Sequence, residues 1–432
     1  MAIHDGKYCA EKSFYDLEII VTGKDKEHCF IPYHDNTGEP PPELAEGMIS
    51  IKWDKINKKW ITANIKEEWY NYNNKEWVNV VLVEKEREEY YQNNDNIDII
   101  EADVLAYLVW IPRYRYQLFN VDSLEIKERK IEIIFEDKIT SKSKGNKNNE
   151  WLTHPAFTFG SDEINGFWVG KFETTGDADK PTVKPTTEAQ NVSSLRGQPI
   201  SEQFMTAKLF NSRTEELDYG LTPNYKAHMM KNIEWGAVAY LSHSQYGKEG
   251  EIWINPSRDY YTGCAGDTPD SEKTYGCLHY YYDDIGMNAS TTGNIYGIYD
   301  MSGGAIDYVM GGMYRNFGSN RIYRQSTDFS NSQLTIGSSS FIGFKYIDAY
   351  DYGTEDQEYI FNRRHLGDAT GETNDWYNDR HSFVREGDFW FNRGGDYADI
   401  HNSGIFAFTC NGGHGDSNYT FRLVVSGFIL NN

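Results

Sequence analysis

The sequence contains no long apolar run. No stretch of the 432 residues approaches the roughly eighteen apolar residues that a membrane-spanning helix needs. Residues 1–16 interrupt every apolar stretch with a charge, whereas a secretory leader has a basic start followed by an unbroken apolar core. We therefore expect a soluble chain with neither membrane insertion nor a signal peptide.

Positive charge is also scarce. Lys and Arg total 42 against 65 Asp and Glu, which gives a net charge of −23. A surface field of this sign repels a phosphate backbone. Nucleic acid is therefore excluded as a partner.

Cysteine is rare, and its spacing is not that of a metal site. The five residues, Cys9, Cys29, Cys264, Cys277 and Cys410, form no C-x-x-C pair, which argues against a zinc site and against a disulfide scaffold. We expect reduced, structural thiols. A Cys264–Cys277 bond in an oxidising setting is the alternative.

What the sequence has in abundance is Tyr and Gly. Aromatic residues make up 15% of the chain, with 32 Tyr and 38 Gly. This composition is typical of a loop-rich protein that displays amphipathic rings. The length predicts one large domain together with a smaller one.

Turn signals and apolar patterning suggest where these two parts meet. Short alternating runs at 17–21 and 48–53 predict a small β-rich module over residues 1–98, and the polar stretch 92–96 makes a boundary. The second domain then covers residues 99–432. Within it, 104–112 and 131–135 are predicted strands, and helical spacing occurs over about 201–209 and 230–241.

Three motifs are spaced along the second domain. They are Gly166-Phe-Trp-Val-Gly-Lys-Phe-Glu173, Gly297-Ile-Tyr-Asp-Met-Ser-Gly-Gly304, and Arg393-Gly-Gly395 followed by Phe421-Arg-Leu-Val424. Their order resembles the formylglycine-generating-enzyme (sulfatase-modifying-factor) family over about residues 99–427. The resemblance implies an α+β fold with a loop-rich, C-type-lectin-like domain. Glycine pairs 303–304 and 394–395 predict positive φ and close backbone approach.

The chain departs from the catalytic members of that family. They use two cysteines after the Arg-Gly-Gly motif, and the matching positions here are Asp399 and Gly404. Cys410 alone does not replace a thiolate pair. The iron-dependent relatives need a His-x-x-x-His-x-Glu cluster, which the sequence lacks. We therefore expect no catalysis, with a formylglycine-generating-type oxidase as the competing hypothesis.

The family resemblance also implies an optional calcium ion. Family members bind it through a carboxylate just after the second motif, together with backbone carbonyls, and Asp307 stands at that position. Oxygen ligands of this kind suit a hard cation. No cofactor is expected to be required.

The segment from Asn392 to Tyr419 contains no Trp, Met, Lys, Gln or Glu. Those five residues are among the ones that substitution of the adenines in AAC or AAT codons does not reach, which is the mutational rule of diversity-generating retroelements. The segment thus resembles the variable region of their target proteins, placed here at about 390–420. A rigid scaffold lets such a face change its chemistry without losing the fold.

Side-chain pattern separates candidate ligand contacts from framework in this segment. The candidate exposed, ligand-binding positions are Asn392, Asp396, Ala398, Asp399, Ile400, His401, Thr409, Cys410, Asn411, His414 and Asp416. Phe406, Phe408, Phe421, Leu423 and Val425 are the expected core positions.

The resulting hypothesis is a receptor-binding protein of a phage tail tip or an adhesin of a bacterial surface. Its ligand is a protein or glycan on a target cell, bound by shape, aromatic stacking and hydrogen bonds. The N-terminal module then serves attachment or tail assembly, and homo-oligomerisation raises avidity. An undiversified glycan-binding structural subunit on the same fold is a further alternative.

Overall fold

The computed structural model describes the backbone of residues 2–4, 7–10, 18–22, 25–30, 33–121, 127–315, 321–322, 327–351 and 365–427. It is a mixed structure, with 14% of residues in helices and 28% in strands distributed over several sheets. The expected α+β class therefore holds at the level of secondary-structure content.

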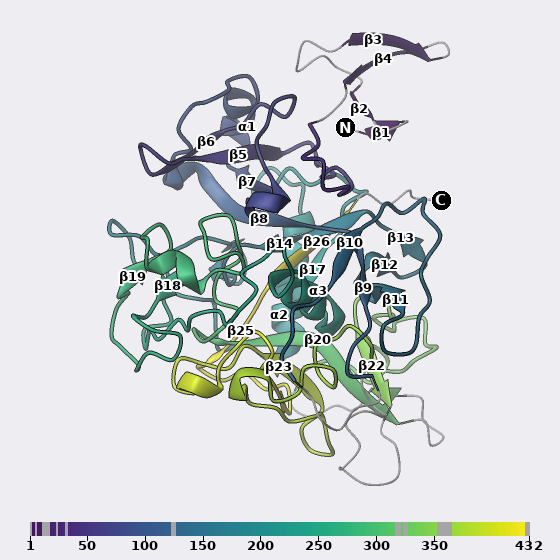
Figure 1. The fold of residues 1–432 in the computed structure, drawn as a ribbon, viewed down its shortest axis with the longest axis vertical. Helices are drawn as coiled ribbons and strands as arrows, with labels where there is room; N and C mark the ends of the chain where they lie inside the picture. Colours follow the sequence, from purple (N-terminus) through teal and green to yellow (C-terminus); the bar gives the residue numbers. More distant parts are fainter. Residues whose placement is uncertain are drawn as a thin grey trace.

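A seven-stranded sheet runs through the upper half of the molecule (Figure 1). Its order is β17 (Ala227–Met229), β26 (Leu423–Ser426), β14 (Gly166–Gly170), β8 (Val104–Pro112), β7 (Asn79–Val83), β5 (Met48–Asp54) and β6 (Lys59–Thr62). All nine residues of β8 are buried, because β8 lies mid-sheet and is covered on both faces. The strands expected at 48–53 and 104–112 are confirmed.

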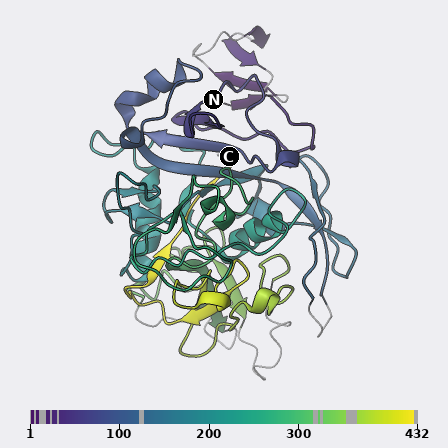
Figure 2. The same cartoon turned by 60° about the vertical axis from the view of Figure 1, so that its left-hand side comes forward.

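The boundary expected near residue 98 falls inside this sheet. Strand β7 hydrogen-bonds to β8 from Asn79 opposite Val109 to Val83 opposite Val104, so residues on both sides of the boundary share one sheet. The first thirty residues contribute a separate four-stranded sheet of order β1 (Ala2–His4), β2 (Lys7–Ala10), β4 (Asp25–Phe30) and β3 (Glu18–Thr22). It lies at the top of Figures 1 and 2. Because β7 pairs with β8 across residue 98, strands β5, β6 and β7 belong to the same sheet as β8.

Lys171 of the first sequence motif joins both sides of that boundary. Its ammonium group is fully buried and donates to Asn79 Oδ1 (2.9 Å), the Ile295 carbonyl (2.6 Å) and the Gly297 carbonyl (2.8 Å). The three N–H donors of the ammonium group thus have three acceptors. Asn79 comes from β7 and Gly297 from the second motif, so one side chain holds three distant segments together.

A six-stranded sheet occupies the lower half of the molecule (Figure 1). Its main path is β21 (Arg321–Ile322), β20 (Ile306–Arg315), β23 (Trp390–Arg393) and β24 (Phe408–Asn411), with β22 (Asp348–Asp351) and β25 (Tyr419–Phe421) pairing β20 in parallel. Because β25 and β26 are separated by a single residue, the end of the chain links the two sheets.

Helix α3 (Asn232–Ser242) contacts both β8 of the upper sheet and β20 of the lower one (Figure 1). All eleven of its residues are buried. A Cβ atom at Gly236 would stand 2.0 Å from the Gly367 carbonyl oxygen, so only glycine fits there. Helices α2 (Ile200–Lys208) and α3 confirm the two helical patterns of the sequence.

The remaining elements are short. They comprise a three-stranded sheet of β10 (Ile133–Phe135), β9 (Tyr114–Gln117) and β11 (Trp151–Thr153), the pairs β12 (Thr158–Phe159) with β13 (Asp162–Glu163), β15 (Thr175–Gly176) with β16 (Pro181–Thr182) and β18 (Cys264–Ala265) with β19 (His279–Tyr280), helix α1 (Lys85–Gln92), and the 3-10 turns η1 (Tyr72–Asn74), η2 (Glu101–Asp103), η3 (Pro155–Phe157), η4 (Leu209–Asn211), η5 (Gly286–Ala289), η6 (Trp376–Asn378) and η7 (Ile400–Asn402).

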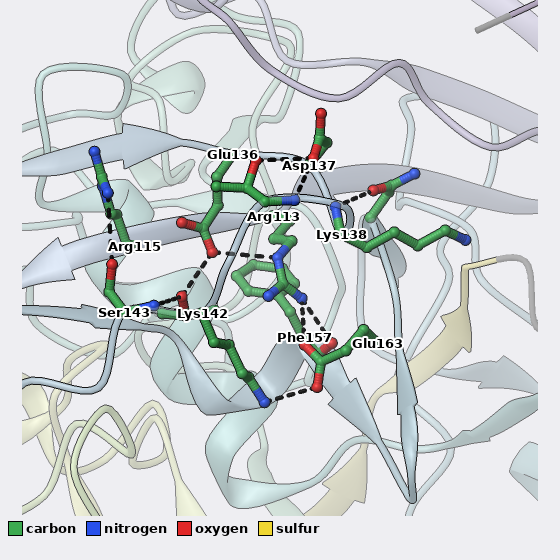
Figure 3. Close-up of polar contacts among 12 residues, drawn as sticks. Arg113, Arg115, Glu136, Asp137, Lys138, Lys142, Ser143, Phe157 and Glu163 are labelled. Carbon is green, nitrogen blue, oxygen red and sulfur yellow. Dashed lines mark hydrogen bonds and ion pairs between the residues drawn. The ribbon is translucent and has the colours of Figure 1, made fainter. Parts of the chain in front are cut away.

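A buried arginine fixes the three-stranded sheet beside the upper one (Figure 3). Arg113 is fully buried between β8 and β9, and its guanidinium contacts Glu136 (3.2 Å) and Glu163 (2.7 Å). Lys142 reaches the other oxygen of Glu163 at 2.7 Å. Two opposing carboxylates compensate the desolvated guanidinium, as a buried charge requires.

The expectation of reduced thiols is wrong for two of the cysteines. Cys264 and Cys277 form a disulfide with their Cα atoms 5.4 Å apart. Pairing of β18 with β19 folds the chain back on itself here, which brings residues thirteen positions apart within bonding reach. Cys410 is a free thiol. In the described part of the chain, no helix is long and apolar enough to cross a bilayer.

Candidate functional site

The 392–419 segment lies at the end of the molecule opposite the four-stranded sheet (Figures 1 and 2). It runs along β23, turns through η7, returns along β24, and reaches β25 through a loop. Strands β23 and β24 pair with Asn392 opposite Thr409 and Trp390 opposite Asn411. Both strands belong to the lower sheet, which gives the segment a hydrogen-bonded base.

The two glycine pairs of the sequence motifs meet at the start of this segment. All four residues have positive φ, 73° and 72° at Gly303 and Gly304 and 82° and 67° at Gly394 and Gly395, as the sequence predicts. The Gly303 amide donates to the Gly394 carbonyl at 3.1 Å. A Cβ atom at Gly395 would stand 2.7 Å from the Ser403 hydroxyl oxygen. Close approach of the two backbones therefore fixes the start of the turn.

The turn from Asp396 to Ser403 is held by its own polar groups. Asp396 Oδ1 accepts from the amides of Ala398 (2.8 Å) and Asp399 (3.2 Å), and its carbonyl accepts from the Ser403 hydroxyl (2.7 Å). Such Asp-to-backbone bonds stabilise a turn without other packing. The turn is thus an ordered platform for the side chains that it exposes.

Exposure differs among the eleven candidate positions. Ala398, His401, His414 and Asp416 are exposed, and Asp396, Asp399, Ile400, Thr409, Cys410 and Asn411 are half-buried. We call these ten residues the candidate face. The five expected core positions, Phe406, Phe408, Phe421, Leu423 and Val425, are all buried.

Asn392 was expected to be exposed, and this expectation is wrong. Its side chain is 1% exposed because β23 lies between β20 and β24. Asn392 Oδ1 accepts from the Thr409 hydroxyl. Asn392 is therefore a framework residue, and it orients the half-buried Thr409.

The remaining half-buried positions on β24 also have local partners. Asn411 Nδ2 donates to the Tyr419 hydroxyl at 2.7 Å, and Cys410 Sγ lies 3.7 Å from the Ser382 hydroxyl. Burial raises the pKa of the Cys410 thiol, which disfavours its thiolate form. In the loop beyond, His414 lies 3.0 Å from Asp416.

Sequence reasoning missed contributors from outside the segment. Arg380 Nη1 lies 3.4 Å from Asp399 Oδ1, and Ser382 neighbours Cys410. Farther away in sequence, Arg196 stacks on the Tyr260 ring at 3.9 Å, and Tyr260 packs edge-on against Tyr397 at 5.1 Å. None of these residues lies in a recognisable motif, so only the fold brings them beside the 392–419 segment.

The candidate calcium ligand Asp307 lies away from this face. It is 1% exposed, and its Oδ2 lies 3.3 Å from Arg422 Nη2. Burial raises the pKa of Asp307 to about 6, while the Arg422 charge opposes the rise. Glu173 and Asp300 interact with the same pair, and burial likewise raises the pKa of the Glu173 carboxyl. The site is therefore a buried acid cluster organised around one guanidinium.

Calcium at Asp307 stays a prediction. Asp307 Oδ1 and Glu173 Oε2 are buried carboxylate oxygens without a hydrogen-bond partner among the described residues, whereas the guanidinium of Arg422 already supplies a positive charge at Asp307 Oδ2. Among the residues that the structure describes, no group of three or more His, Cys, Asp or Glu side chains is arranged to hold a metal ion.

The positions that match the catalytic cysteines of the resembled family are unsuited to a thiol pair. Asp399 is half-buried in the turn. A Cβ atom at Gly404 would stand 2.1 Å from Asp379 Oδ1. The carboxyl of Asp379 in turn accepts from the Phe406 amide at 3.0 Å.

No known protein family matches the chain, and a search of curated proteins finds no match.

Proposed function

We propose that the chain is a non-catalytic binding protein on a C-type-lectin-like, formylglycine-generating-enzyme-like domain, with a binding face diversified by a retroelement. It acts as a phage receptor-binding protein or a bacterial surface adhesin. Its ligand is a protein or glycan on a target cell. The N-terminal strands serve attachment, and assembly into an oligomer or a phage tail raises avidity.

The observation that carries this proposal is that the 392–419 segment contains both buried framework residues and exposed residues. Its buried residues, among them Arg393, Phe406 and Phe408, pack into the core, whereas the turn around Asp396 and the loop around His414 expose their side chains. Exposed positions on an ordered base can change without loss of core packing. This arrangement is the physical requirement for a face that varies.

The competing oxidase is not favoured by the local geometry. A cysteine at Gly404 would collide with the Asp379 carboxyl, and Cys410 is a single thiol whose neutral form is stabilised by burial. Thiolate chemistry needs a depressed pKa and a partner. The residues present therefore support binding rather than group transfer.

The genomic surroundings of the coding sequence test the proposal directly. We expect a near-copy of the region that encodes residues 392–419, differing at adenines and adjacent to a reverse-transcriptase gene. A locus with neither would refute diversification and leave the undiversified glycan-binding subunit.

A binding experiment tests the face itself. Exchange of Ala398, His401 and Asp416 together for Tyr should leave the Tm nearly unchanged, because all three are exposed. Binding to a panel of intact bacterial strains, measured by flow cytometry, should change its pattern. An unchanged pattern at unchanged Tm would place the binding surface elsewhere.

A further inference from the structure

The segment around Arg380 runs beside β24 although it lies outside residues 392–419. The Phe408 amide donates to the Arg380 carbonyl at 2.9 Å, and the Ser382 amide donates to the Phe408 carbonyl at 2.8 Å. These bonds fix the backbone of the segment against the strand. Arg380 is thus held at the edge of the candidate face. Position 380 lies outside the segment that we propose to vary, so the arginine itself stays constant.

Two arginines of this segment differ in where their partners come from. Arg380 is 60% exposed and contacts Asp399 at 3.4 Å, whereas Arg385 is 55% exposed and contacts Asp388 at 2.8 Å. Asp388 lies three residues from Arg385 in the same turn. Asp399 belongs to the 392–419 segment. The charge of Arg385 is therefore always compensated, but that of Arg380 depends on the residue at position 399.

We propose that Arg380 is a fixed ligand-binding residue of the candidate face, which binds a carboxylate of an acidic peptide segment whenever residue 399 carries no negative charge. With Asp399 the guanidinium is shielded, and with a neutral residue it is available. This inference rests on the proposed function, because it gives position 399 a role in selecting ligands.

The chemistry of the groups supports such an exchange. A guanidinium presents a planar fork of donors that matches a carboxylate, so an external carboxylate can replace the internal one. An exposed ion pair of this kind is weak and is screened by salt, so displacement is not prevented by its strength. The charges of both arginines act on the Cys410 thiol, and burial raises its pKa, which disfavours a thiolate that would compete for Arg380.

The test compares three variants of the full chain. Asp399→Asn removes the charge and keeps the shape of the side chain, and Arg380→Gln/Asp399→Asn also removes the guanidinium. Asp267→Asn is the matched control, because Asp267 is exposed, its replacement changes the net charge equally, and it pairs with His279 outside the candidate face. The probe is fluorescein-labelled hexaglutamate at about 0.01 M salt, where screening is weak, with affinity measured by fluorescence anisotropy.

We expect Asp399→Asn to raise the affinity about threefold, the size of effect that an exposed ion pair gives. The double variant should return to the original affinity, and Asp267→Asn should stay close to it. Equal gains for Asp399→Asn and Asp267→Asn, or a gain that survives Arg380→Gln, would overturn the proposal. So would a gain seen for an oligosaccharide ending in N-acetylneuraminic acid but not for the peptide.

The outcome is separable from that of the proposed function. The genomic template decides whether the segment varies, and hexaglutamate binding decides whether Arg380 is available. A template with no effect at Arg380 rejects the further inference alone. An effect at Arg380 without a template rejects diversification alone.

Discussion

At the scale of single residues, buried polar side chains decide which segments stay together. Lys171 has no carboxylate among its three acceptors, and burial lowers its pKa well below the ordinary value of a lysine. Its hydrogen bonds rather than an ion pair hold it in place. Loss of such a donor leaves several acceptors without partners in the core.

Lys171→Met should therefore destabilise the protein strongly although it adds no bulk. We expect a loss of about 3 kcal/mol or more, because Asn79 Oδ1 and two buried carbonyls lose their donor. Urea unfolding measures the loss. The matched control is Lys184→Met, which changes the same charge at a half-buried position and should cost much less.

Two buried histidines predict acid lability. Burial lowers the pKa of His243 to about 4 and that of His154 to about 3, below the usual 6.5. A depressed pKa in the folded state means that the unfolded chain binds the proton first. Stability from these groups is thus complete above about pH 6.5 and is lost as the pH falls toward 4.

Replacement of His243 by Gln should reduce that loss. Between pH 6.5 and 4.5 the wild type should lose about 2 kcal/mol more than His243→Gln, because the unfolded chain takes up a proton at this residue over nearly the whole interval and the folded chain does not. Urea unfolding at both pH values gives the difference, and His154 remains as a shared background. Parallel pH profiles for the two proteins would show that His243 is not kept neutral.

At the scale of elements, the turn between β23 and β24 depends on glycine. Gly395 combines a φ of 67° with a position where a Cβ atom would meet the Ser403 hydroxyl. Ser403 also donates to the Asp396 carbonyl, so displacement of this side chain disturbs the turn. The glycine pair is thus a geometric requirement of the candidate face.

Gly395→Ala should destabilise the protein by about 2 kcal/mol, from left-handed strain together with steric overlap. Gly387→Ala is the matched control, since Gly387 also has positive φ but a Cβ atom there would meet nothing within 4 Å. The difference in Tm between the two variants isolates the contact with Ser403. Equal losses would show that strain alone acts at residue 395.

Sequence pattern predicted the elements best where one physical cause dominates. Strand β8 and helix α3 could be predicted from the apolar run and the helical spacing of their sequences, because burial repeats along the chain. Positive φ at Gly303 and Gly394 was readable because glycine alone adopts it freely. Asn392 was misassigned because its burial depends on strand order, which no local pattern encodes.

At the scale of the whole molecule, long-range pairing set the limits of prediction. The boundary at residue 98 followed a local polar stretch, whereas β7 and β8 pair across it. The disulfide and the contact between Arg380 and Asp399 likewise join segments that are distant in sequence. Exposure within residues 392–419 was therefore predicted in outline, whereas the residues that the fold brings beside this segment were not.

A chain that begins at residue 99 should fail to fold cooperatively, because it lacks β5, β6 and β7 and exposes the edge of β8. A chain that begins at residue 33 keeps the seven-stranded sheet and should retain a cooperative transition. Circular dichroism during heating distinguishes the two. Cooperative unfolding of the chain that begins at residue 99 would instead support the predicted independent domain over residues 99–432.

The bond between Cys264 and Cys277 makes the redox state of the chain depend on its surroundings. Glutathione keeps thiols reduced in most cytosols, so at this pair of cysteines newly made copies inside a cell should carry two more hydrogen atoms than copies exposed to air or an extracellular medium. Mass measurement of the peptides that contain Cys264 and Cys277 would show in which of the two populations the bond has formed.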